Sequence, residues 1–259
     1  RNFLKTLSGM ALLTVVPRHV LGGPKHVAPS DQLTKGIIGV NVMVAMSNFA
    51  DMVRTAIAEK ADIIFSGAGM PLNLPSFLTK GSKTKLAPIV SSARAAKLIC
   101  EKWLANYKYV PDAIVVEGPK AGGHLGYKPE QITDEHFSLE RLLPEIVSEV
   151  RRFGTAHDTH IPVIAAGGIY TGEDIYRIME LGADGVQMGT RFVSSAESPV
   201  HANYKAAITG AKETGTWVLN KKASPCIRAS TGALAPSRLR YCNSPFAQAR
   251  QSPRQWRNS

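Results

Sequence analysis

Residues 161–168 read Ile-Pro-Val-Ile-Ala-Ala-Gly-Gly, a short apolar run that ends in two glycines. The same pattern occurs at residues 113–123, which begin with Ala-Ile-Val-Val and end with Gly-Gly, and at residues 185–190, which read Gly-Val-Gln-Met-Gly-Thr. Apolar strands that end in glycine and alternate with helical segments are typical of a (β/α) barrel. In such a barrel the ligand site is built from the loops at the carboxyl ends of the strands. These units therefore predict parallel strands with a site at one end.

Further apolar runs predict six buried strands, and the amphipathic segments between them predict helices. The expected strands are 37–43, 61–66, 86–91, 113–117, 161–166 and 185–189. The expected helices are 48–59, 92–105, 138–153, 172–181 and one near 202–212. A closed barrel of this kind has eight strands, so we expect an α/β fold of the TIM-type (β/α)8 barrel class that is incomplete.

The basic charge of the chain lies at its two ends. The formal net charge is +11, and residues 221–259 contain eight lysines and arginines without an acidic residue. Residues 1–35 are also basic, which leaves the part between them close to neutral. Because the basic residues near the carboxyl end are scattered among prolines, we expect no nucleic-acid partner and a disordered tail over 217–259.

The first residues have the sequence pattern of an export signal peptide. A basic start is followed by an apolar run that ends near Val16, which is too short to cross a membrane. We expect a signal-like leader over 1–35, a barrel domain over 36–216 and no membrane span. Residues 1–40 resemble the leader of exported sugar-dehydrogenase-like oxidoreductases.

His124 is the candidate catalytic residue. It follows Gly122 and Gly123 and precedes Gly126, at the end of a predicted strand. The flanking glycines allow a ligand to approach both the backbone and the imidazole ring. An imidazole can remove a proton from a carbon acid or donate one to a developing anion.

Two strand ends predict a phosphate site. Gly167 and Gly168 end one strand, and Gly189 with Thr190 ends the next. Exposed amides in the last loops of a barrel commonly bind phosphate, and the hydroxyl of Thr190 adds a donor. Tight turns are the alternative explanation for these glycines.

Two polar residues lie at or near the ends of other predicted strands. Asn41 lies between valines, and Glu117 ends the run that precedes the glycine-rich loop of His124. A polar side chain in an apolar strand needs a hydrogen-bond partner when it is buried. The edge of a flavin ring would suit Asn41, and Glu117 could accept hydrogen bonds from ribityl hydroxyls or pair with a lysine.

Residues 36–215 resemble the nitronate monooxygenase family, formerly called 2-nitropropane dioxygenases, which are FMN-dependent barrels. The matching segments are 39–43, 65–69, 116–124, 164–169 and 187–192. The resemblance implies FMN as cofactor, a nitronate or nitroalkane and O2 as substrates, and His124 as the catalytic histidine. The residues that it places at the FMN are Asn41, Glu117, Gly122, Gly123, Gly167, Gly168, Gln187, Met188, Gly189 and Thr190.

Other functions share these motifs. The flavin-dependent enoyl-acyl-carrier-protein reductases also carry the Gly-Gly-His segment, so an NAD(P)H-dependent reductase is the second hypothesis. The family's usual opening strands and its usual terminal segment have no match here, which suggests a chimeric or frameshifted chain. An inactive partial barrel is therefore the third hypothesis, and the sequence leaves the oligomeric state open.

Overall fold

The computed structural model describes residues 37–211, 215–219 and 226–230. In this part of the chain, six parallel strands alternate with helices. The strands are β1 (Gly39–Met43), β2 (Ile63–Gly67), β3 (Lys85–Val90), β4 (Ile114–Glu117), β6 (Val163–Ala166) and β7 (Gly185–Gln187). The helices are α2 (Phe49–Ala58), α3 (Ala93–Tyr107), α4 (Leu139–Ala156), α5 (Gly172–Glu180), α6 (Thr190–Val193) and α7 (Ala202–Thr209). All six strands predicted from the sequence are confirmed.

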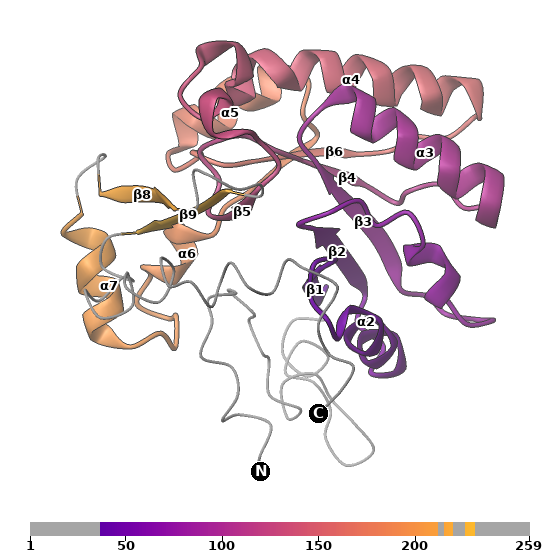
Figure 1. Ribbon diagram of the computed structural model, residues 1–259, viewed down its shortest axis with the longest axis horizontal. Coiled ribbons are helices and arrows are strands. Elements are labelled where there is room, and N and C mark those ends of the chain that lie inside the picture. The colour runs from indigo at the N-terminus through magenta and orange to yellow at the C-terminus, as the bar shows by residue number, and fades with distance from the viewer. Residues whose placement is uncertain (1–36, 212–214, 220–225, 231–259) are drawn as a thin grey trace, which may run out of the picture.

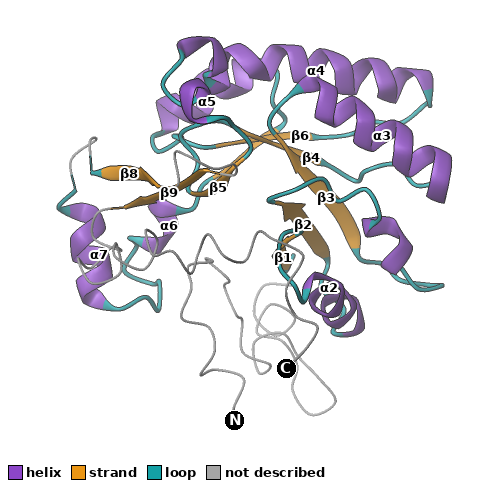
Figure 2. Ribbon diagram, in the orientation of Figure 1, coloured by secondary structure: helices purple, strands orange, loops and turns teal. Residues whose placement is uncertain are grey.

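The six strands form a curled sheet in the order β1-β2-β3-β4-β6-β7. Figure 1 shows that the sheet curves like half of a barrel, and Figure 2 shows α3, α4 and α5 along its convex side. Helix α2 packs on β1, and α5 packs on β7. The prediction of an incomplete barrel is confirmed for the described residues, because β1 and β7 do not meet to close the sheet.

A second sheet lies beside the half-barrel, with the order β5-β9-β8. It contains β5 (Gly123–Leu125), β8 (Thr216–Leu219) and β9 (Cys226–Ser230), and its pairs are antiparallel. Strands β8 and β9 lie where we expected a tail without regular structure, so the structure differs from that expectation at these residues. Strand β9 pairs with β8 and with the distant β5, and local composition does not reveal such pairing. The remaining tail residues and the predicted leader lie outside the described residues.

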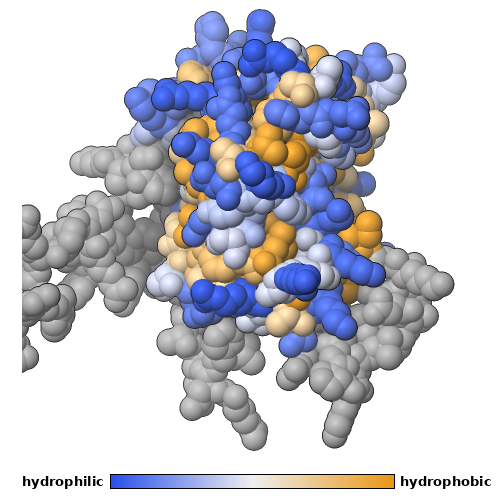
Figure 3. All heavy atoms as spheres, turned by 90° about the vertical axis from the view of Figure 1, so that its right-hand side faces the viewer, coloured by the Kyte–Doolittle hydropathy of each residue, from blue (hydrophilic) through white to orange (hydrophobic). Residues whose placement is uncertain are grey.

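The core lies between the sheet and the helices on its convex side. Ile64, Leu86 and Ile114 point from three strands into this layer and are fully buried. Trp103 of α3 is also buried, and its indole N–H donates a hydrogen bond to the carbonyl oxygen of Pro71 at 3.0 Å. Figure 3 shows the outer surface from the side, with hydrophilic groups around patches of apolar ones.

The concave face of the sheet is less completely covered. Phe65, Ile89 and Ile164 alternate with the core residues of their strands, and all three remain partly exposed. In a closed eight-stranded barrel, side chains from opposite strands fill this interior. The half-barrel therefore presents an apolar concave wall to whatever lies at the strand ends.

Three aspartates connect neighbouring strands at their amino-terminal ends. Asp62, which precedes β2, accepts a hydrogen bond from the backbone N–H of Ile38 at 2.8 Å. Asp112, before β4, accepts one from the N–H of Leu86 at 2.9 Å. Asp184, before β7, accepts one from the N–H of Val163 at 2.8 Å. Each aspartate thereby ties the start of its own strand to the start of a neighbouring strand.

None of the helices in residues 37–211 combines the length and the apolar character that a membrane span requires. The longest of them, α4, carries charged residues along one side.

Replacing Asp184 with alanine is expected to destabilise the fold by about 1–3 kcal/mol, because the N–H of Val163 loses its acceptor. Asp184→Asn is the matched variant, since its amide oxygen can still accept this hydrogen bond. Urea unfolding followed by circular dichroism would measure both. Equal losses for alanine and asparagine would show that the hydrogen bond does not fix the strand.

Candidate active site

The register of the sheet brings four of the predicted residues to one edge. Ala166 at the end of β6 pairs with Glu117 of β4 on one side and with Gln187 of β7 on the other. Gly167 and Gly168 follow Ala166 directly. Glu117, the glycine pair and Gln187 therefore lie side by side at the carboxyl ends of neighbouring strands, where barrel sites are built.

Gly167 and Gly168 are needed for the shape of this edge. Their φ angles are +101° and +79°, which side-chain-bearing residues rarely adopt. A Cβ at Gly167 would lie 2.9 Å from the backbone nitrogen of Ala121, and one at Gly168 would lie 2.9 Å from Cδ of Lys120. The two glycines let the loop before His124 pack against the end of β6. Their contact with FMN stays a prediction.

His124 lies in β5 and pairs with Ile227 of β9. It is half-buried, and burial lowers the pKa of its imidazole. Since the ordinary pKa of histidine is about 6.5, the lowered pKa makes the neutral ring the main form at pH 7. A neutral imidazole can accept a proton from a substrate, which is one of the two roles that the sequence predicted for it.

A small apolar cluster holds the His124 segment in place. Its buried members are Ala121, Leu125, Tyr127 and Ile132, with Phe137 packed edge-on against Tyr127. The hydroxyl of Ser91 donates to the carbonyl oxygen of Gly126 at 3.2 Å. Leu125 and Gly126 follow His124 directly, so these contacts fix the backbone beside the histidine.

Tyr127 is a residue of the site that the sequence interpretation missed. Its hydroxyl donates to the backbone carbonyl of Glu117 at 2.7 Å, which connects the histidine segment to the end of β4. Burial, and then the nearby Glu117, raise the pKa of Tyr127, so its hydroxyl keeps the proton that this hydrogen bond needs. Its role depends on a contact with the end of another strand, which the local sequence does not signal.

Glu117 is an unusual carboxyl group. Burial raises its pKa to about 7. Among the described residues, no cation pairs with its carboxylate and no donor is hydrogen-bonded to it. Its protonated form is therefore populated near neutral pH, and can then donate a hydrogen bond as well as accept one.

Most of the remaining predicted residues are exposed or have open space beside their backbone, and Met188 packs against the core. Gly122 and Gly189 have open space where a Cβ would point, and Gly123 has a φ of +82°. Thr190 is exposed at the start of α6. Met188 packs against the main core, so its side chain supports the fold.

Asn41 is not brought to the other predicted residues. It lies on β1, the far edge of the sheet from β7, and pairs with Phe65 of β2. Its side chain is exposed on the concave face. We expected Asn41 to need a hydrogen-bond partner if its side chain were buried. Because the side chain is exposed, it has no such need.

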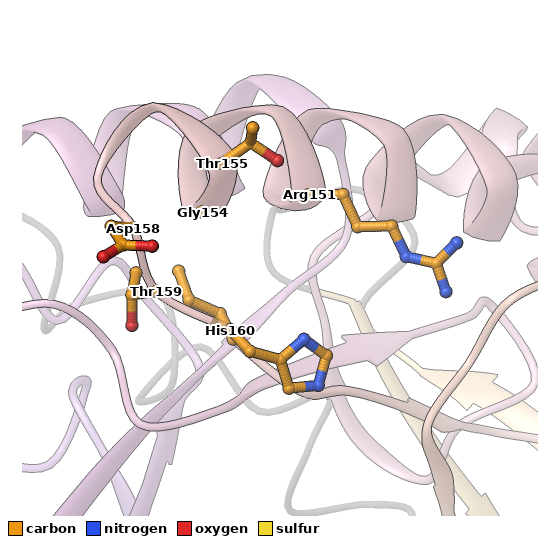
Figure 4. A pocket seen from close by; sticks show the side chains of 7 residues that line it. Arg151, Gly154, Thr155, Asp158, Thr159 and His160 are labelled. Carbon is orange, nitrogen blue, oxygen red and sulfur yellow. The ribbon is translucent and has the colours of Figure 1, made fainter.

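A surface hollow of about 520 Å³ lies elsewhere, between the end of α4 and the start of β6. Figure 4 shows Arg151 and His160 extending to one side of it, with Asp158 and Thr159 on the other. This hollow is at the amino-terminal end of β6, opposite the edge that carries Glu117 and Gly167. Barrel sites form at the carboxyl-terminal end, so it is not the candidate site.

The sequence model of the family described as "Nitronate monooxygenase" matches residues 11–237. The chain belongs to this family. The match includes Glu117, His124 and the glycines of the candidate site. It also reaches into the segments expected to be a leader and a tail, and the proposed boundaries of those segments stay predictions.

One curated relative carries the name of this family, and two solved structures share the fold. A "Probable nitronate monooxygenase" of Staphylococcus saprophyticus is 33% identical over 181 residues, which are 69% of this chain and 46% of that protein. The structure of FabK from Thermotoga maritima is 30% identical in sequence, with a TM-score of 0.65. The match covers 85% of this chain and 62% of the FabK chain. A nitroalkane oxidase from Streptomyces ansochromogenes shares the fold at 20% identity, with a TM-score of 0.57, over 84% and 66% of the two chains. This chain spans about half the length of the curated relatives it matches.

Replacing Glu117 with glutamine is expected to stabilise the protein at high pH. The folded-state pKa of about 7 exceeds the ordinary 4.5, so wild-type stability falls as the pH rises from 4.5 through 7. The advantage of Glu117→Gln should therefore grow by up to about 3 kcal/mol between pH 4.5 and pH 8. Urea unfolding at a series of pH values would measure it. A difference that stays constant over this range would contradict a buried, unpaired carboxyl.

Proposed function

We propose that this chain is the catalytic part of an FMN-dependent nitronate monooxygenase. It would oxidise alkyl nitronates or nitroalkanes with O2, giving a carbonyl compound and nitrite. The observation that carries the proposal is a half-buried His124 with a lowered pKa, in the segment whose Lys120 and Ala121 pack against Gly168 and Gly167, in a chain of the nitronate monooxygenase family.

The described residues fit a flavin nucleotide in three respects. Partly exposed apolar side chains of the concave wall, among them Phe65 and Ile164, suit the face of a flat aromatic ring. The glycine backbone at Gly122 and Gly189 leaves space for a ligand to approach. Glu117 and Gln187, which flank Ala166, offer donors and acceptors to ring or ribityl atoms. When bound, FMN would supply the redox chemistry.

The protein's part in the reaction is then proton transfer and orientation. His124 would take the proton from the carbon next to the nitro group when the substrate arrives as a nitroalkane. A nitronate arrives already deprotonated, and would then need His124 only for orientation. The hydrogen bond from Tyr127 to the end of β4 and the Ser91 contact keep the histidine segment in position while substrate enters.

Two measurements on the FMN-loaded protein test this proposal. Oxygen uptake and nitrite release should follow the addition of a propyl nitronate in air. Without oxygen, NADH and NADPH should leave the flavin absorbance near 450 nm unchanged. A protein that stays colourless after incubation with FMN, or that forms no nitrite, would contradict the proposal.

The second candidate is an NAD(P)H-dependent enoyl-acyl-carrier-protein reductase, which the Gly122-Gly123-His124 segment also fits. In this reaction the imidazole of His124 would lie near the thioester carbonyl of the substrate. Rapid anaerobic bleaching of the flavin by NADPH, followed by recovery with an enoyl thioester, would favour the reductase.

Replacing His124 with asparagine is expected to lower nitroalkane turnover by about a hundredfold to ten-thousandfold, because the general base is lost. The loss with a preformed nitronate should be smaller, since that substrate has no proton to give. His136→Asn is the matched control, because the side chain of His136 is 91% exposed on a surface turn. Steady-state nitrite release with both substrates would test this, and equal losses would argue against proton abstraction.

A further inference from the structure

An arginine and a tyrosine stack between the two loops that carry the strand-end glycines. The Cζ atom of Arg191 lies 4.6 Å from the centroid of the Tyr170 ring. Tyr170 comes two residues after Gly168, beyond β6, and Arg191 comes two residues after Gly189, beyond β7. The pair therefore connects neighbouring loops at the edge that carries the candidate site.

Hydrogen bonds at the start of α5 fix the backbone of Tyr170. Its backbone N–H donates to Oδ2 of Asp174 at 3.1 Å, and the N–H of Thr171 donates to the same oxygen at 2.9 Å. The hydroxyl of Thr171 accepts from the N–H of Asp174 in return, which completes a capping box at the start of α5. Tyr170 is thus placed by a helix start, and its ring gives Arg191 a fixed support.

The guanidinium of Arg191 has no acidic partner among the described residues. Arg177 differs, because it pairs with Asp174 at 3.0 Å and with Glu140 at 3.5 Å. Arg54 also lies over an aromatic ring, that of Phe77, but it pairs with Asp51 as well. Arg191 is therefore a stacked arginine whose charge is not neutralised by a carboxylate in this part of the chain.

A stacked guanidinium keeps its hydrogen-bonding capacity. The ring occupies one flat face of the group, while the N–H donors point outward along its edge. These donors match two oxygens of a phosphate group, and such charge-assisted pairs are among the strong hydrogen bonds of proteins. Tyr170 is 48% exposed, so a ligand at the strand ends can reach the pair from solvent.

We propose that Arg191, oriented by Tyr170, binds the phosphate monoester of the flavin nucleotide and so selects FMN over riboflavin. This inference rests on the proposed function, because it takes a flavin at the candidate site as given. Tyr170 is a positioning residue in it, since it acts on the ligand only through Arg191.

Fluorescence quenching titrations with FMN and with riboflavin test the inference directly. Arg191→Gln should weaken FMN binding about tenfold or more and leave riboflavin binding unchanged. Tyr170→Phe keeps the ring and should behave as wild type, whereas Tyr170→Leu should weaken FMN binding alone. Arg152→Gln is the control, since Arg152 pairs with Glu149 on α4 and lies away from this edge.

Inorganic phosphate gives a second measurement that needs no intact flavin site. It should compete with FMN in the wild type and compete much less in Arg191→Gln. An unchanged ratio of FMN to riboflavin affinity in Arg191→Gln, or an equal loss for both ligands, would overturn the role of Arg191. A wild type that binds neither flavin would overturn the proposed function together with this inference, whereas one that binds both equally would overturn only the inference.

Discussion

The hydrogen bonds from strand backbones to Asp62, Asp112 and Asp184 set the positions on which the candidate site depends. Each carboxylate precedes one strand and holds the beginning of its neighbour, so the two strands start at matched heights. Parallel strands that start together and have similar lengths also end together. Asp184 aligns β6 with β7 in this way, and the backbone N–H of Ile114, which donates to the carbonyl oxygen of Pro162 at 2.8 Å, aligns β4 with β6. Glu117, Ala166 and Gln187 pair across these strands and so reach the same edge.

Burial acts in opposite directions on the two titratable residues of this edge. It raises the pKa of Glu117 and lowers that of His124, because in both cases it disfavours the charged form. Near neutral pH the histidine is therefore uncharged and the glutamate is partly so. A weakly charged region beside an apolar concave wall is suited to a flat heteroaromatic ring, while the positive charge of Arg191 lies toward the loops.

Much of the half-barrel could be predicted because its signals are local. A strand covered by helices is an unbroken apolar run, as in residues 161–166, and a capped helix such as α5 begins with acidic residues. Strand β5 has no such signal, since Gly-His-Leu is too short and too polar to indicate a strand before its partner is known. Asn41 illustrates another limit, because the sequence predicts a strand but not that the strand lies at the sheet edge. The roles of Tyr127 and Tyr170 depend on contacts between loops, which spacing along the chain does not reveal.

The pairing of β5 with β9 has a consequence for how the protein folds. His124 pairs with Ile227, and closing a loop of about a hundred residues carries an entropic cost that local contacts avoid. The six parallel strands, by contrast, pair mostly with neighbours along the chain. During synthesis the half-barrel can therefore form while the residues of β9 are still inside the ribosome. Strand β5, which holds His124, would pair with β9 last. The half-barrel would therefore be compact before His124 is fixed in place.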